Sequence, residues 1–125
     1  MQIRGAVTPS AAVVVALVAV LTACGGSPSP SFEEKRAQHL AVLKAAGDQG
    51  RREALSVQRS RLAEGIPAVA SSPTRDECER RWTVGGNQEQ TAGARDAFIG
   101  ACASFPVPGL PGHTAAVAEA EAATP

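Results

Sequence analysis

Large apolar side chains are scarce in this chain of 125 residues, and their scarcity limits the fold that the chain can adopt. From residue 24 onward only 17 of 102 residues are Val, Ile, Leu, Phe or Trp, whereas the whole chain holds 25 alanines. Short chains bury a low fraction of their surface, so there is room for one small domain with a thin core. This composition excludes a large enzyme, a multidomain machine and a polytopic membrane protein.

Two capping-box patterns predict where helices begin. Ser31 with Glu34 and Thr74 with Glu77 both match the S/T-x-x-E signature of a helix N-terminus. The residues that follow the first box are rich in Ala, Leu, Glu and Lys, which are good helix formers. The sequence therefore predicts a small all-α protein.

The first helical region spans residues 31–66 and contains two glycines in its middle. Gly47 and Gly50 mark a weak point, so the region forms either one bent helix or two helices. Gln58 and Arg59 interrupt its narrow apolar stripe. We therefore expect this helical region to be mostly solvated.

A helical hairpin is expected in residues 74–104. Its first helix covers residues 75 to about 83 and is stopped by a Gly-Gly pair. Asn87 with Gln90 resembles a further N-cap, which starts a second helix running to about Ala103.

Three segments have the composition of flexible connections. Residues 24–30 form a Gly/Ser/Pro tether, and residues 68–73 form a second linker. Residues 105–125 hold four of the nine prolines and few large apolar groups, so we expect a disordered tail.

Residues 1–23 have the layout of an export signal. Arg4 supplies a positive charge, and an uninterrupted apolar run of eleven residues follows from Ala11 to Leu21. This run is about half of the roughly 20 residues that a helix needs to cross a bilayer. It therefore predicts the apolar part of a signal peptide.

The end of this signal resembles the lipobox of bacterial lipoproteins, with the motif Leu21-Thr22-Ala23-Cys24. The resemblance implies that a diacylglycerol is attached to the Cys24 thiol and that signal peptidase II cleaves after Ala23. Two acyl chains would then hold the protein on the outer face of the cytoplasmic membrane. The alternatives are an ordinary secretory signal that happens to end in Cys, or an uncleaved membrane stub.

The ratio of ten Arg to two Lys, with abundant Ala, Gly, Val and Pro, resembles proteins of GC-rich bacteria. Together with the lipobox, the chain is similar to small actinobacterial lipoproteins. This resemblance implies no catalytic residues.

Three cysteines are an odd number, and lipidation of Cys24 would explain the odd one. Cys78 and Cys102 would then form a disulfide in an oxidising compartment. Trp82 follows Cys78 by four residues and Phe98 precedes Cys102 by four, which keeps each aromatic on the helix face of its cysteine. In an antiparallel hairpin, the disulfide and an aromatic pair would lie one turn apart. Trp82 could instead be a binding anchor.

Two free thiols or a metal site are the alternatives to the disulfide. A metal would need His39 and His113 as partners, and neither spacing matches a zinc pattern. We therefore expect no metal and no cofactor.

Residues with catalytic potential are few. Ser56, Ser60 and Ser104 are candidate nucleophiles, but none lies in a G-x-S-x-G motif. The histidines that could serve them are on a solvated helix and in the loose tail.

Charged residues cluster in two places. Asp76, Glu77 and Glu79 alternate with Arg75, Arg80 and Arg81, which is typical of a solvated helix face rather than of catalytic carboxylates. A second group is basic and could bind anionic headgroups or wall polymers, although acidic neighbours reduce its net charge. It comprises Arg51, Arg52, Arg59 and Arg61.

From residue 24 onward the formal charge is −1, which gives no electrostatic attraction for nucleic acid. The sequence predicts a lipid-anchored, non-catalytic interaction or accessory module that binds an envelope protein or a cell-wall partner. A small envelope enzyme or an inhibitor of one is the alternative. A third possibility is a chain that is disordered outside residues 74–104.

Overall fold

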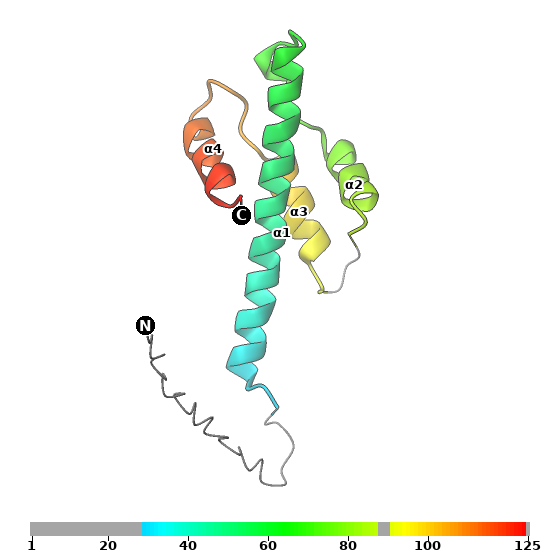
Figure 1. Ribbon diagram of the computed structural model, residues 1–125, viewed down its shortest axis with the longest axis vertical. Coiled ribbons are helices and arrows are strands. Elements are labelled where there is room, and N and C mark those ends of the chain that lie inside the picture. The colour runs from blue at the N-terminus through cyan, green and yellow to red at the C-terminus, as the bar shows by residue number, and fades with distance from the viewer. Residues whose placement is uncertain (1–28, 88–90, 125) are drawn as a thin grey trace, which may run out of the picture.

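A single long helix, α1 (Phe32–Ala63), is the central element of the molecule (Figure 1). The structure is a computed structural model, and it describes residues 29–87 and 91–124. Ser31 caps α1 and forms the expected capping box with Glu34. The helix passes without interruption through both glycines, so the region is one helix and not two.

The other elements follow in chain order; α3 and α4 pack on α1, and α2 packs on α3. They are the short 3-10 helix η1 (Ala68–Ala70) and the helices α2 (Arg75–Val84), α3 (Ala94–Ala103) and α4 (His113–Ala122). In the view of Figure 1, α2 and α4 lie on opposite sides of α1, and α3 crosses behind it. The fold is all-α, as predicted.

Close approach of α1 and α3 depends on Gly50. A Cβ atom at this position would lie 2.2 Å from the carbonyl oxygen of Phe98 on α3. Gly47, one turn earlier, has more room, since the nearest atoms to a Cβ there would be 3.9 Å away. Gly50 therefore marks the helix crossing and not a weak point.

The core joins side chains of α1 to those of α2 and α3. Its α1 members are Ala46, Ala54 and Leu55. Its members from α2 and α3 include Cys78, Trp82, Phe98, Ile99 and Cys102, and Phe105 and Ala120 extend the cluster beyond α3. Alanine thus builds much of the interface, which explains how a chain with few large apolar residues forms a core.

The first part of α1 is as solvated as expected, but the second part is not. Residues 31–42 are all exposed, whereas Ala46 to Gln58 include a buried face. The prediction of a mostly solvated helix was wrong at Gln58, because this polar residue of the broken apolar stripe is only 1% exposed.

The prediction of a disordered tail was wrong for residues 113–122, which form α4. Gly112, at a φ of +85°, lets the chain turn into the helix after Pro111. Ala120 is fully buried in the core cluster, and Arg52 of α1 donates to the carbonyl oxygen of Ala123 at 2.7 Å. The small alanine side chains allow α4 to pack closely. They gave no pattern of large apolar residues from which this helix could be predicted.

The second helix of the hairpin begins later than predicted. Its N-cap is Gly93, at a φ of +90°, and the helix starts at Ala94. A left-handed residue at this point ends any helix that began earlier, and glycine adopts that conformation at little cost. Asn87 is therefore not the cap, and Gln90 lies outside the described residues.

Candidate functional site

The predicted disulfide joins Cys78 of α2 to Cys102 of α3, with 6.0 Å between the Cα atoms. The ring centroids of Trp82 and Phe98 are 5.3 Å apart, one helical turn from the disulfide. Both aromatic residues are buried, with Phe98 fully so. Trp82 is therefore a core residue rather than an exposed binding anchor.

The candidate nucleophiles and the histidines are not brought together. Ser60 Oγ lies 3.4 Å from a carboxylate oxygen of Glu64, and Ser104 Oγ donates to the carbonyl oxygen of Gly100. Ser56 is exposed on α1. His39 lies on the solvated first part of α1, whereas the second histidine begins α4.

His113 instead belongs to a polar cluster inside the fold. The Gln58 amide nitrogen donates to the carbonyl oxygen of Pro106 at 2.7 Å and to Ser72 Oγ at 3.0 Å. Its amide oxygen lies 3.0 Å from His113 Nε2, and the His113 ring packs edge-on against Phe105. Because the amide oxygen can only accept, His113 must carry its proton on Nε2. The cluster fixes the start of α4 against α1.

The acidic residues of α2 have structural partners. A carboxylate oxygen of Glu77 accepts the Thr74 backbone N–H at 2.7 Å, and Arg61 of α1 binds the other oxygen. The hydrogen bond from Thr74, with a further contribution from Arg61, lowers the pKa of Glu77 below its ordinary value. Glu79 pairs with Arg75 and Arg95, while Asp76 is exposed.

The four arginines of α1 that could have formed a basic patch are used within the molecule. Arg51 binds Asp48, Arg59 binds Glu121 of α4, and Arg61 binds Glu77 of α2. Arg52 holds the end of α4 as described above. Lys44 also binds Asp48. Hydrogen bonds from Lys44 and Arg51 lower the pKa of the Asp48 carboxyl below its ordinary value. The long-range pairs could not be found from sequence spacing.

No group of three or more metal-ligating side chains comes together in the part of the chain that the structure describes. None of the helices in that part is long and apolar enough to cross a membrane.

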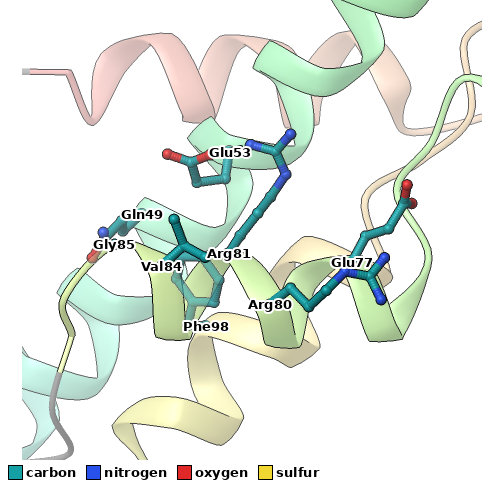
Figure 2. A pocket seen from close by; sticks show the side chains of 8 residues that line it. All are labelled: Gln49, Glu53, Glu77, Arg80, Arg81, Val84, Gly85 and Phe98. Atoms are coloured by element: carbon teal, nitrogen blue, oxygen red, sulfur yellow. Dashed lines mark hydrogen bonds and ion pairs between the residues drawn. The ribbon is translucent and has the colours of Figure 1, made fainter.

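A cleft of about 560 Å³ lies between α1 and α2 (Figure 2). It combines apolar walls with charged groups. Its lining residues are Gln49, Glu53, Glu77, Arg80, Arg81, Val84, Gly85 and Phe98.

Most charges of this cleft are neutralised within the protein. Arg81 donates to Glu53 across the cleft at 3.0 Å, and Glu77 is bound by Arg61. Arg80 has no ion-pair partner among the described residues and is exposed. Val84, at the end of α2, is 86% exposed. Among the residues that the structure describes, the cleft thus presents the Arg80 cation without an ion-pair partner and, near it, an exposed apolar group.

The lipobox residues Leu21, Thr22, Ala23 and Cys24, like the export signal, lie outside the described residues. No family model, curated protein or solved structure matches the chain.

Proposed function

We propose that this protein is an exported lipoprotein, anchored through Cys24, that acts as a non-catalytic interaction module at the outer face of the cytoplasmic membrane. The observation that carries the proposal is the use of the three cysteines. Cys78 and Cys102 bind one another, so neither is available to Cys24 of the Leu-Thr-Ala-Cys motif. A disulfide between them suits an oxidising compartment outside the cytoplasm.

The cleft between α1 and α2 is our candidate for the partner-binding surface. Interface centres favour exposed apolar groups and arginine over lysine or carboxylates. Val84 and Arg80 supply these two features at one edge of the cleft. The partner would carry an acidic group next to an apolar one.

The anchor is tested by the intact mass of the protein extracted from membranes with detergent. We expect a chain that starts at Cys24, heavier by a diacylglycerol and lighter by the two hydrogens of the disulfide. The Cys24→Ala variant should leave the membrane fraction. An unlipidated wild-type protein would contradict the proposal.

The binding surface is tested by a photoreactive amino acid placed at Val84 in the otherwise intact, anchored protein. We expect an adduct with an envelope protein or wall polymer from this position. The matched control places the same group at Thr114, which is exposed on α4. Equal adducts from both positions, or none from Val84, would refute the assignment of the cleft.

A further inference from the structure

The face of α1 that packs on the core continues beyond the helices that cover it. Gly47, Gly50 and Ala54 lie on the buried face of α1. Residues three or four apart share a helix face. In such steps toward the N-terminus, the same face carries Leu43, Leu40, Arg36 and Phe32.

The part of this stripe that other helices cover ends at the start of α3. Leu43 is half-buried, and its Cδ2 atom would lie 3.4 Å from a Cβ atom at Gly93, the N-cap of α3. Beyond it, Leu40 is 53% exposed and Phe32 is 79% exposed. Figure 1 shows this part of α1 projecting past the other helices. Two large apolar groups are thus left without a partner in the described part of the chain.

The charges around the stripe favour an anionic surface. Arg36 lies within the stripe and Lys35 beside it, and neither forms an ion pair with a described residue. Glu34 points to the opposite side of the helix, where it accepts the Ser31 backbone N–H at 2.7 Å. Glu33 lies at the edge of the stripe. An apolar face with basic residues beside it is typical of helices that lie at a membrane surface, and here Glu33 offsets one of the two positive charges.

The distance to the proposed anchor also favours a membrane. Seven residue steps separate Cys24 from Ser31, and they span about 25 Å at full extension. If Cys24 carries the lipid, the beginning of α1 is therefore held close to the headgroups. This step of the inference rests on the proposed anchor.

We propose that the first three turns of α1, Phe32 to Leu43, contact the anionic lipid surface in which the Cys24 anchor is embedded. Because α3 occupies the same face from Gly93 onward, α1 approaches the membrane at a tilt and Phe32 enters deepest. The alkyl stem of Arg36 lies along the apolar boundary while its guanidinium binds lipid phosphates.

The test uses the full lipidated protein in vesicles of phosphatidylcholine and phosphatidylglycerol. A Leu40→Cys variant provides a single free thiol for an environment-sensitive fluorophore, because the three native cysteines are lipidated or paired. The matched control is Ala41→Cys, which is exposed and lies about 100° further around the helix, outside the stripe. Far-UV circular dichroism checks that both variants keep their helices.

We expect blue-shifted emission and quenching by nitroxide-labelled lipid at position 40, with water-like emission at position 41. A label at Phe32→Cys should be quenched more strongly than one at position 40. Vesicles without phosphatidylglycerol should weaken these differences.

Equal signals at positions 40 and 41, on protein that floats with the vesicles, would overturn this inference and leave the anchor intact. Protein that fails to float would instead overturn the anchor and, with it, this inference. Self-quenching that grows with protein density at position 40, without quenching by lipid, would identify a second copy as the occupant and also overturn it.

Discussion

Single residues carry much of the specificity of this small fold. Gln58 is a polar residue in a thin core, and it connects three separate segments through Ser72, Pro106 and His113. A buried polar group stabilises a fold only when its hydrogen bonds are made. The Gln58 side chain makes three such contacts, which defines how residues 105–113 return to α1.

Gly47 and Gly50 provide a matched pair of substitutions on one helix. Alanine is favoured over glycine by about 1 kcal/mol in a helix interior. At Gly47 a Cβ has room, so Gly47→Ala should stabilise the protein by about 0.5–1 kcal/mol. At Gly50 the same atom would meet the Phe98 carbonyl, so Gly50→Ala should destabilise it by about 1–3 kcal/mol as α1 and α3 move apart.

Urea unfolding followed by circular dichroism gives both free energies. A stabilising Gly50→Ala variant would show that α1 and α3 do not cross as closely as described. Equal stabilisation by both variants would mean that the helix propensity of alanine, and not the helix crossing, decides the effect.

At the scale of elements, the helices depend on one another to different degrees. α2 packs on α3 and is tied to α1 by the Arg61–Glu77 and Arg81–Glu53 ion pairs. Partly exposed ion pairs contribute little to stability. The disulfide to α3 and the contact between Trp82 and Phe98 therefore hold α2 in place.

Removal of the disulfide should lower the free energy of unfolding by about 3–4 kcal/mol, because in the unfolded chain the bond joins residues that are 24 positions apart. The Cys78→Ala/Cys102→Ala variant tests this in thermal melts with and without a reductant. The wild-type protein with reductant should approach the variant, and the variant should not respond to reductant.

An unchanged melting temperature in the double variant would show that packing alone holds α2. A loss of the near-UV signal of Trp82 without a change in far-UV helicity would mean that α2 stays helical but leaves the core.

At the scale of the whole molecule, α1 has two environments along one continuous helix. Its C-terminal part is covered by α3 and α4, whereas residues 31–42 are solvated on every side. Isolated helices of this length are marginal in water, so the projecting part depends on its continuity with the packed part and on the Ser31–Glu34 capping box. The molecule thus combines a packed helical body with an extended arm on the side of the proposed anchor.

The sequence by itself determined the local features. The capping boxes at Ser31 and Thr74 start helices because a side-chain oxygen satisfies a free backbone N–H within four residues. The Cys78–Cys102 pairing and the Trp82–Phe98 contact followed from a spacing of four on facing helices. The capping boxes depend only on residues close in the sequence. The disulfide and the aromatic contact depend only on the pairing of two helices in one hairpin.

Only the tertiary structure decided the packing of the small residues and the long-range contacts. The role of a glycine or an alanine depends on which atoms of other helices lie against it. Nothing local distinguishes Gly50, at the helix crossing, from Gly47. The alanines of α4 gave no apolar pattern, yet Ala120 is fully buried. The cleft includes the ion pair of Arg81 with Glu53, which joins residues 28 positions apart in the chain, and Arg80, which has no ion-pair partner in the described part of the chain. Such contacts need the packed helices, and sequence spacing could not predict them.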